Sequence, residues 1–535
     1  MRKILIFSFL CFSQFLLAQK RSSNLQLLDA HTGQVVSAAR VYLIYAADTV
    51  AELSDAEGKV YWQKTPLSIS IRHLAYEIYQ TAELKDRGLY FLVPKQDQLE
   101  EVVVTGQAGP TIGREAVRQV RVIDQKRIQR QAAVNLGDLL QKDLNFQVSQ
   151  DGVLGAQISL QGMSGAKVKI LIDGVPMIGR LDGNIDLNQI NLNDIERVEI
   201  IEGPMAVQYG TDAVAGTINL ITKKSQKSSF QAQANTYVES VGRYNFDAGL
   251  QWVPFSGSQL GINLGRNYFT GYDPVSESRN LQWNPKEQYF GSLHYRQRFK
   301  NSILRLRSDF FDEEIRNAGA VGSIDSLIIP VDTGAWQYPR ALDDTYLTHR
   351  LNNALFLNNY GKNGSTWQGF LAYNFFERQK RSEVKNLSTG ESTLFNGTDA
   401  QDTSTFHLWA SRFSYAGDSW SWLKWQLGYD VNWELNAGER IANGEKEILD
   451  AALYGSAEFK PGTNFSLKPG LRYAYNSRFE APLISSLALR WEMDSNWVFR
   501  ASYGRGFRAP SLKELYFLFV DENHNILGNE ELRAE

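Results

Sequence analysis

Histidine and cysteine are the side chains of this 535-residue chain best suited to bind a metal ion or to attack a substrate, and they are few. No two of the histidines have the spacing of metal ligands. They are His31, His73, His294, His349, His407 and His524. The only cysteine, Cys11, lies in an apolar segment near the N-terminus. The sequence therefore predicts no metal site, no cofactor and no disulfide.

Two glycine-containing stretches have the outline of catalytic or phosphate-binding motifs. "YGTDAVAG", residues 209–216, lacks the Lys-Ser/Thr pair of a P-loop. "GMSGA", residues 162–166, lacks the final glycine of a nucleophile elbow. The formal net charge of −3 gives no indication of nucleic-acid binding. We therefore expect neither an enzyme nor a nucleic-acid-binding protein.

The first 20 residues, "MRKILIFSFLCFSQFLLAQK", have the composition of a targeting segment. Arg2 and Lys3 precede an apolar run, and Ala18 is a small residue suited to cleavage. The run is shorter than the ~20 residues that a membrane-spanning helix needs. We expect residues 1–18 to be a secretory signal peptide.

The next two regions differ in their patterning. Residues 20–98 contain short alternating segments, such as "VYLIYA" and "LSISIRHL", separated by turn signals, which predicts a small β-sandwich. Residues 107–225 combine strands that end in Gly/Pro turns with a short helix at 135–144, for which Asn135 is the predicted N-cap. This second region is predicted to be an α+β domain.

Residues 226–535 have the pattern of a membrane β-barrel. Eleven of the twelve tryptophans lie in this region. In "LKWQLGYDVNW", residues 423–433, apolar and polar side chains alternate over about ten residues, which is typical of a strand that crosses a bilayer. A strand of a soluble protein averages only ~5–6 residues. The chain is therefore predicted to be mainly β.

The barrel region is predicted to contain thirteen strands, joined alternately by short turns and long loops. The strands are expected near 228–238, 243–253, 258–268, 287–298, 301–312, 346–359, 365–378, 403–416, 421–434, 449–459, 464–475, 483–493 and 496–505. The long connections are expected at 269–286, 313–345, 379–402 and 435–448. Because such barrels have an even number of strands, we expect the barrel to be incomplete in this sequence.

Several motifs resemble those of a TonB-dependent outer-membrane receptor. "EEVVVTG" resembles the TonB box, and "ILIDGVPM" and "DIERVEIIEGPMAVQYGTDAVAGTINLITKK" resemble the plug domain of that family. "YGRGFRAPSLKEL" resembles a segment late in the barrels of the family. Residues 20–98 are similar to the carboxypeptidase-regulatory-like domain of Bacteroidetes members. The resemblance implies a 22-stranded transmembrane antiparallel barrel around a plug at 107–225.

The resemblance also implies site residues. Residues 99–106 would form the TonB box and linker, and an extended strand there could add to a sheet of TonB. The expected TonB-binding residues are Glu100, Glu101, Val102, Val103, Val104, Thr105 and Gly106. The expected plug-motif residues are Asp173, Gly174, Pro176, Glu202, Gly203, Pro204, Tyr209, Gly210, Gly216 and Asn219. The alternative is that "EEVVVTG" is simply the last strand of the N-terminal sandwich.

The function that the resemblance implies is active import across the outer membrane. A scarce nutrient, such as a siderophore or cobalamin, would bind, and TonB would rearrange the plug by pulling. The implied partners are TonB, outer-membrane lipid and the small-molecule nutrient, with a surface lipoprotein left open, and the N-terminal domain would lie in the periplasm. The alternatives are a haem receptor that uses His524, a signalling receptor and a passive porin.

Overall fold

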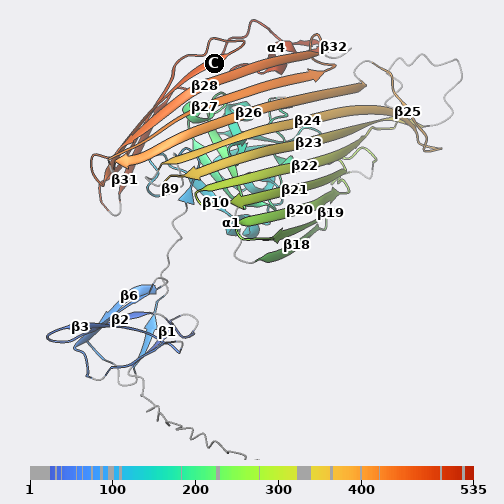
Figure 1. Cartoon of the computed structure of the whole chain (residues 1–535). Helices are drawn as coiled ribbons and strands as arrows, with labels where there is room; N and C mark the ends of the chain where they lie inside the picture. The colour runs from blue at the N-terminus through green and yellow to red at the C-terminus, as the bar shows by residue number, and fades with distance from the viewer. Residues whose placement is uncertain are drawn as a thin grey trace, which may run out of the picture. The chain divides into compact units, whose positions relative to one another are not determined.

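The structure is a computed structural model of the chain (Figure 1). It describes residues 25–30, 33–37, 39–55, 57–62, 64–73, 76–84, 88–93, 102–107, 111–181, 183–223, 229–275, 278–321, 339–361, 365–397, 400–420, 422–494, 497–520 and 525–535. The chain divides into two compact units, Met1–Glu100 and Glu101–Glu535. No helix within the described ranges is both long enough and apolar enough to cross a membrane.

The first unit consists of two small sheets around one apolar core. One sheet has the strand order β4-β1-β7 and the other β3-β2-β5-β6. The strands are β1 (Leu25–Asp29), β2 (Arg40–Ile44), β3 (Thr49–Leu53), β4 (Lys59–Val60), β5 (Ser68–His73), β6 (Tyr76–Thr81) and β7 (Leu89–Leu92). Alternate side chains of β1, β2 and β5 pack in the core, as a sandwich requires.

The second unit begins with the α+β plug. Its main sheet has the order β10-β16-β17-β14-β15. The strands are β8 (Val102–Val103), β9 (Thr111–Ile112), β10 (Arg121–Asp124), β11 (Phe146–Asp151), β12 (Gly155–Leu160), β13 (Met163–Ser164), β14 (Val168–Ile172), β15 (Val175–Pro176), β16 (Ile195–Glu202) and β17 (Gly216–Thr222). The helices are α1 (Gln125–Arg130), α2 (Leu136–Leu140), η1 (Gly165–Lys167), η2 (Leu187–Gln189) and α3 (Ala206–Tyr209).

The plug helix α2 begins where the sequence predicts. The Asn135 side chain accepts a hydrogen bond from the Asp138 amide, as an N-cap does. Leu136, Leu139 and Leu140 are buried in the largest apolar cluster of the plug, against the sheet. The helix therefore covers one face of the plug sheet with its apolar side chains.

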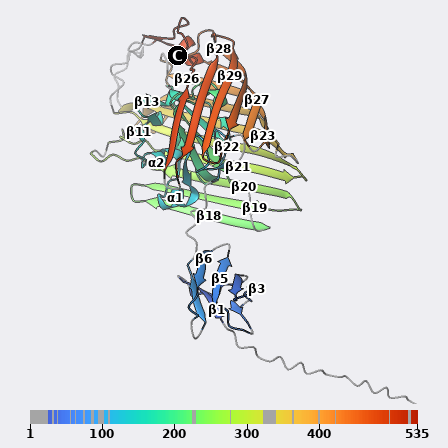
Figure 2. The same ribbon diagram turned by 90° about the vertical axis from the view of Figure 1, so that its left-hand side faces the viewer.

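The barrel part is one antiparallel sheet in which each long strand pairs with the next along the chain. Among the described residues, thirteen strands follow in sequence, as predicted, and a short β25 (Ser392–Leu394) pairs with β24 off this path. They are β18 (Phe230–Glu239), β19 (Arg243–Trp252), β20 (Ser258–Phe269), β21 (Lys286–Arg298), β22 (Ser302–Ala318), β23 (Arg340–Tyr360), β24 (Thr366–Asn386), β26 (Gln401–Trp420), β27 (Leu423–Gly438), β28 (Glu445–Phe459), β29 (Phe465–Asn476), β30 (Ile484–Glu492) and β31 (Val498–Gly504). The strand direction turns progressively across the sheet (Figure 2), as the right-handed twist of sheets requires.

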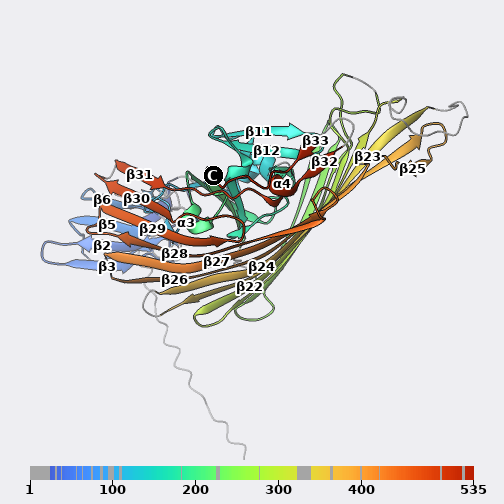
Figure 3. The same cartoon turned by 90° about the horizontal axis from the view of Figure 1, so that it is seen from above.

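The two faces of this sheet differ as the alternation predicts. Seen from above, the sheet curves around plug elements such as β11 and β12 (Figure 3). In β27, Leu427, Tyr429 and Trp433 are exposed on the outer face, whereas Gln426 and Asp430 are buried on the face toward the plug. The apolar face is thus outside, and the polar face meets the plug. Within the described residues this sheet does not close, and β18 and β31 are its two end strands.

The predicted ends of the longest strands are wrong, and so are the predicted long loops at 379–402 and 435–448, whereas the ends of strands such as β19, β20 and β29 agree to within one residue. β22 to β24, β26 and β27 run 16 to 21 residues, and β27 and β28 occupy most of the predicted loop at 435–448. The short connection expected between the predicted strands 403–416 and 421–434 lies mostly inside β26, which shows a register irregularity there. Outside the apolar zone of the outer face, both faces of a strand carry polar side chains. The alternation of apolar and polar residues therefore fades there, although the backbone hydrogen bonds to the neighbouring strand continue.

The last described residues follow β31 as an irregular segment with α4 (Leu512–Tyr516), β32 (Leu518–Val520) and β33 (Asn525–Leu527). Ser511 and Glu514 form a capping box at the start of α4. Leu512, Leu515 and Tyr516 pack with Ile441 of the β27–β28 connection. The segment is thus held against the barrel strands on the side of the plug.

Candidate functional site

The segment that resembles the TonB box, residues 100–106, which we call the handle, is packed within the plug over its described residues 102–106. Val102 and Val103 pair with Ile112 and Thr111 of β9, rather than with a strand of the first unit. The reading as a last sandwich strand is therefore wrong. Val103 and Thr105 are fully buried, with exposed fractions of 0%. Glu100 and Glu101 lie outside the described residues.

A single carboxylate holds the middle of the handle. The Val104 amide lies 3.0 and 3.2 Å from the two carboxylate oxygens of Glu199. The Thr105 amide and hydroxyl donate to Glu199 Oε2 at 2.7 and 2.5 Å. Glu199 lies in β16 with no exposed surface, and Arg197 Nε donates to it at 2.8 Å. Such charge-assisted bonds in a dry site are stronger than bonds between neutral groups. We call Glu199 the handle clamp.

Gly106 is the point where the handle meets both plug and barrel. Its amide donates to the Tyr209 hydroxyl at 3.1 Å. Its carbonyl accepts from Gln208 at 3.0 Å and from Lys468 of β29 at 2.9 Å. Gly106 has a φ of +72°, and an added Cβ would lie 2.9 Å from the Met205 side chain. Glycine is therefore required here by both conformation and space.

Asn219 connects the handle to the turn between β14 and β15. Its side chain donates to Thr105 Oγ1 at 2.9 Å and accepts from the Gly174 amide at 3.0 Å. Asp173 and Gly174 have φ values of +49° and +87°, which is the conformation of a type I′ hairpin turn. The Asp173 carboxylate accepts from Thr222 Oγ1 at 2.6 Å and from Arg305 of the barrel at 2.9 Å.

The remaining plug-motif residues lie around these contacts. The Pro176 carbonyl, in β15, accepts from Asn374 of the barrel at 2.8 Å, and the Pro204 carbonyl accepts from Arg118 at 2.9 Å. Glu202 accepts from Asn145 at 2.6 Å and from Gln161 at 2.7 Å. Gly203 and Gly210 have positive φ values, and Gly216 packs against the Ile201 carbonyl.

Barrel side chains clamp the plug loop that follows β15. Arg350 donates to the Ile178 carbonyl at 2.7 Å and to the Gln189 side chain at 3.0 Å. Gln189 donates in turn to Glu313 of β22 at 2.8 Å. The ring of Phe376 occupies the space beside Gly179, where an added Cβ would lie 2.5 Å from the ring. The loop is thus fixed by polar and apolar contacts together.

Replacing Gly179 by alanine is expected to loosen the plug more than the same change at Gly174. Both glycines have nearly equal φ values, +86° and +87°, but a Cβ at Gly174 has nothing within 4 Å. Both alanine variants should therefore lose about 1–2 kcal/mol of stability, because alanine is unfavourable at a positive φ. The ring clash should add about 1–3 kcal/mol at Gly179 alone. Thermal unfolding of both variants measures the difference, and equal losses would contradict the clash.

Asp186 makes the stability of the folded chain depend on pH. Its carboxylate caps η2 and accepts from the amides of Ala156 and Asn188 at 2.8 and 2.9 Å. Burial raises the pKa of Asp186 to about 6, although the Lys286 ammonium opposes the rise. The folded state therefore binds more protons than the unfolded state between about pH 4 and about pH 6. This contribution to stability is present below pH ~4 and is lost as the pH rises through ~6.

Asp186→Asn is expected to remove this contribution, because an amide keeps an acceptor oxygen but cannot ionise. The melting temperature of the variant relative to the unmodified chain should rise between about pH 5 and about pH 8. Glu115→Gln, at an exposed position of the plug, is the matched control and should show no such trend. A constant difference between Asp186→Asn and the unmodified chain across this range would contradict the assignment.

A cavity of about 870 Å³ lies between the plug, strands β26 to β29 and the segment after residue 505. The plug contributes Lys169, Arg180 and Asp212 to its lining, and the barrel contributes Glu434 and Asp450. Sites for small molecules in proteins have volumes of roughly 300–1,000 Å³. The cavity is therefore large enough to bind a small organic molecule.

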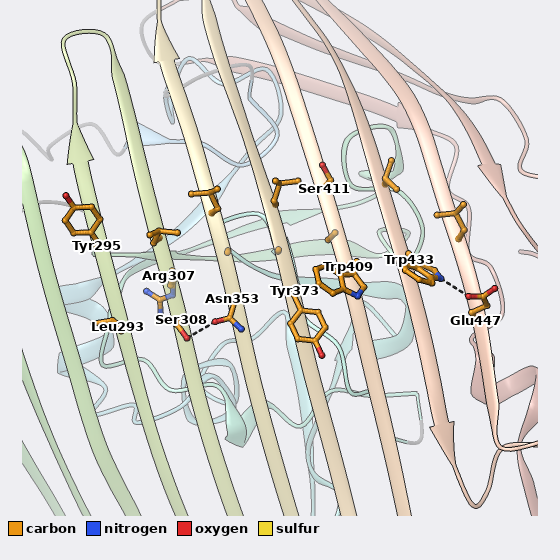
Figure 4. A pocket seen from close by; sticks show the side chains of 18 of the residues that line it. Leu293, Tyr295, Arg307, Ser308, Asn353, Tyr373, Trp409, Ser411, Trp433 and Glu447 are labelled. Carbon is orange, nitrogen blue, oxygen red and sulfur yellow. Dashed lines mark hydrogen bonds between the residues drawn. The ribbon is translucent and has the colours of Figure 1, made fainter.

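A second hollow of about 1020 Å³ lies on the opposite face of the sheet and is a groove of the outer surface. Figure 4 shows Tyr373, Trp409 and Trp433 on three neighbouring strands in front of the plug, and Leu293 on a strand farther along the same sheet. Few polar groups interrupt this surface, and a hydrogen bond of 2.8 Å between Ser308 and Asn353 satisfies one such pair. The groove belongs to the apolar outer face of the barrel, so it is no candidate for the site of a polar nutrient.

Among the described residues, no group of three or more His, Cys, Asp or Glu side chains could hold a metal ion. His524, the candidate haem ligand, lies outside the described residues. Sequence reasoning missed Glu199 and Lys468, which hold the handle. A signal for Glu199 exists, because it is a charged residue within the apolar strand "VEII". Nothing in the sequence near Lys468 indicates its partner.

A long antiparallel sheet that curves around an α+β plug, with a short strand stowed at the start of the plug, defines a plugged β-barrel receptor. The family model described as TonB-dependent Receptor Plug Domain matches residues 113–217, and the model described as TonB dependent receptor-like, beta-barrel matches residues 442–535. The chain belongs to the TonB-dependent receptors. This is a family of transporters and receptors, not of enzymes.

Individual relatives agree with this assignment. The chain is 25% identical over 432 residues to the vitamin B12 transporter BtuB of Vibrio vulnificus and 23% identical over 437 residues to that of Vibrio cholerae. Each match covers 78% of this chain, which spans 64% of the length of these relatives.

Solved structures share the fold. The siderophore receptor PirA from Acinetobacter baumannii has a TM-score of 0.62 at 15% identity and covers 78% of this chain and 66% of its own. The FrpB iron transporter from Neisseria meningitidis has a TM-score of 0.60 at 14% identity, covering 73% and 65%.

Proposed function

We propose that this protein imports a scarce organic nutrient, such as cobalamin or a siderophore, across the outer membrane in a TonB-dependent manner. The nutrient binds in the cavity between plug and barrel, and TonB pulls on residues 100–106 from the periplasm. The relatives support the substrate classes, because their names include a vitamin B12 transporter and siderophore receptors. The observation that carries the proposal is the stowed handle at the start of the plug.

The handle is held in a way that allows release. Among the described residues of the handle, Val102 and Val103 pair with a neighbouring strand, and side chains supply the other hydrogen bonds described above, some as acceptors and some as donors. A partner that adds a strand to Val102–Val104 would replace these bonds by main-chain bonds of its own. The free-energy change of the exchange can therefore be small, although each hydrogen bond that breaks is strong.

Pulling on the handle would act on the plug directly. Once Val104 and Thr105 leave, the buried Glu199 carboxylate keeps Arg197 but loses its other donors. An undersatisfied buried charge destabilises its surroundings by several kcal/mol. Asn219 also loses its bond to Thr105 while it still holds the Gly174 turn. The plug strands β16 and β17 therefore lose support at the moment when force is applied.

The outer apolar face supports a location in a membrane. Exposed aromatic side chains lie at both ends of the outward rows, for example Trp252 and Tyr244 at the two ends of β19. Such girdles lie at the two interfaces of an outer-membrane barrel. In this location the short turns face the periplasm, and the first unit, residues 20–98, lies there too.

Growth of cells that depend on this protein for cobalamin or a ferric siderophore tests the proposal. We expect growth on limiting nutrient to require both the protein and an active TonB. Growth that persists at the same nutrient level after TonB is disrupted would indicate a passive pore. Growth that never depends on the protein, for any nutrient of these classes, would contradict an import function.

A further inference from the structure

β3 and β7 are edge strands of the two sheets in the first unit, and they differ in charge. β3 carries Glu52 at an exposed position, and a charged side chain on an edge strand opposes the addition of a foreign strand. β7 and the residue after it have the sequence "LYFLV", residues 89–93, and contain no charged side chain. β7 is therefore an edge without this protection.

The outer edge of β7 offers backbone hydrogen-bonding groups. The Leu92 carbonyl accepts a hydrogen bond of 2.9 Å from the residue that directly follows β1. Alternate residues of a strand bond to the same neighbour, so Leu89 and Phe91 direct their amides and carbonyls away from β1. Within the described residues no strand pairs with β7 on that side, and the one main-chain bond there joins the Val93 carbonyl to the Glu77 amide at 2.9 Å.

The side chains of β7 that point out of the sandwich form an apolar face with two neighbours. Leu89, Phe91 and Val93 alternate with buried core residues along the chain. Leu28 of β1 lies beside Phe91 in the register of the two strands, and Val35 is bridged to Leu28. Leu28 is half-buried, and the other four side chains have exposed fractions of 38% to 48%. We call these five residues the β7 face. A contiguous exposed apolar surface of this kind marks a docking site.

The outer face of the other sheet is interrupted by charge. Arg40 and Arg72 are exposed and lie opposite each other on β2 and β5, in the middle of that sheet. The exposed apolar side chains Leu53 and Ile78 lie on the outermost strands β3 and β6, with β2 and β5 between them. An uninterrupted apolar surface is thus specific to the β7 face.

Burial of the handle restricts the partner that pulls it. Val103 and Thr105 have no exposed surface, so TonB can pair with the handle only after the handle leaves the plug. The apparent affinity for such a partner is reduced by the fraction of molecules in which the handle is released. A second contact that forms while the handle is stowed offsets this loss, because it raises the concentration of TonB near the handle.

The β7 face is near enough along the chain to provide this second contact. Residues 94–101 connect Val93 to Val102 of the handle, and a segment of this length spans at most roughly 30 Å. A protein bound to the β7 face is therefore tethered to the handle by a short linker. Effective concentrations over such linkers are on the order of millimolar.

We propose that the β7 face docks the periplasmic domain of TonB while the handle is stowed, so that the first unit recruits the partner that later pulls. The inference rests on the proposed import function, because TonB is the partner assumed there. The apolar side chains are covered by packing against TonB, and a strand of TonB bonds to the free edge of β7 through main-chain groups.

Binding of the purified periplasmic domain of TonB to the detergent-solubilised full chain, measured by interferometry, tests the inference. Phe91→Ser is expected to weaken binding at least ~10-fold, since an aromatic side chain at the centre of an interface contributes strongly. Leu53→Ser, at an exposed position of the other sheet, is the matched control and should leave the affinity unchanged. Both positions are exposed, so thermal unfolding should be the same in all three proteins. Equal affinities of the unmodified chain and Phe91→Ser overturn the inference.

A second variant tests the edge of β7 rather than its face. Leu89→Lys places a charge on this strand, as Glu52 does on β3, and should weaken binding as far as Phe91→Ser does. The same variants in a Val103→Pro background measure docking alone, because there the handle pairs poorly. TonB should still bind in that background, and Phe91→Ser should abolish the remaining binding. Complete loss of binding through Val103→Pro by itself would contradict docking to a stowed handle.

Two other occupants of the β7 face give different results. A lipid surface would make Phe91→Ser weaken binding to vesicles of phosphatidylethanolamine and phosphatidylglycerol. A second copy of the chain would make Phe91→Ser reduce self-association, measured by light scattering. Either result together with an unchanged affinity for TonB overturns the inference.

Failure of the docking proposal is distinct from failure of the import function. Uptake that depends on TonB, with an affinity for TonB that Phe91→Ser does not change, would support import and refute docking. Binding of TonB that requires Phe91, with no uptake of any nutrient, would refute import and leave docking standing.

Discussion

Deleting Val102–Gly106 is expected to reduce uptake to the background of cells without the protein, a loss of at least ~100-fold, and to leave ligand affinity within ~3-fold. The deleted residues include the strand that a partner would pair with, and none of them lines the cavity. Accumulation of labelled ligand in cells measures uptake, and equilibrium binding to isolated membranes measures affinity.

Two substitutions distinguish the effect of losing the strand from the effect of shortening the chain. Val103→Pro removes one backbone donor and disfavours strand addition, so uptake should fall about as far as in the deletion. Val103→Ile keeps the backbone donor and the β-branched shape and is the matched control, expected to retain uptake. If the deleted chain still imports more than half of the normal amount, residues 102–106 are not the handle.

Glu199→Ala is expected to release the handle in the absence of both ligand and TonB. The clamp accepts from the Val104 amide and from the Thr105 amide and hydroxyl. Hydrogen bonds to charged groups contribute about 1.5–3 kcal/mol each, so the loss of three shifts the equilibrium by at least ~3 kcal/mol. Such a shift corresponds to a factor of at least ~100 in favour of the released state.

The labelling rate of a single introduced thiol measures the release of the handle. Cys11 is the only cysteine of the sequence, so Val104→Cys in a Cys11→Ser background gives one labelling site beside the clamp. The rate of maleimide labelling should rise at least ~100-fold with Glu199→Ala, if labelling occurs only in the released state. Glu196→Gln is the matched control, because Glu196 also contacts Arg197 but is only partly buried, and no hydrogen bond joins it to the handle. Equal labelling rates in the thiol-bearing background, the Glu199→Ala variant and the Glu196→Gln variant would contradict the role of Glu199 in holding the handle.

The handle shows where local sequence reasoning reaches its limit. Three valines before Thr-Gly predict an extended segment, and Val102–Val103 is indeed a strand. Its stowed position follows from Glu199, which lies 94 residues later than Thr105, and from Lys468, which lies 362 residues later than Gly106. No periodicity within the segment carries information about partners so far away.

The barrel strands show the opposite case. A row of polar side chains facing lipid is unfavourable, so each strand that crosses the membrane must place apolar side chains at every second residue. This pattern involves residues only two positions apart and can be read directly from the sequence. The order of the described strands and the outward face of β27 were therefore predictable. The ends of the longest strands were not predictable. Outside the apolar zone of the outer face, hydrogen bonding to the neighbouring strand decides whether the pairing continues.

By itself the sequence determined the mainly β architecture, the two-sheet first unit, the plug with its capped helix α2, and the face that each barrel strand turns outward. Only the tertiary structure decided that the handle is buried, that Glu199 holds it, and that Lys468 of the barrel contacts Gly106. The reason is the range of the interactions. Alternation and capping act between residues a few positions apart, whereas these ion pairs and hydrogen bonds join residues that only the completed fold brings together.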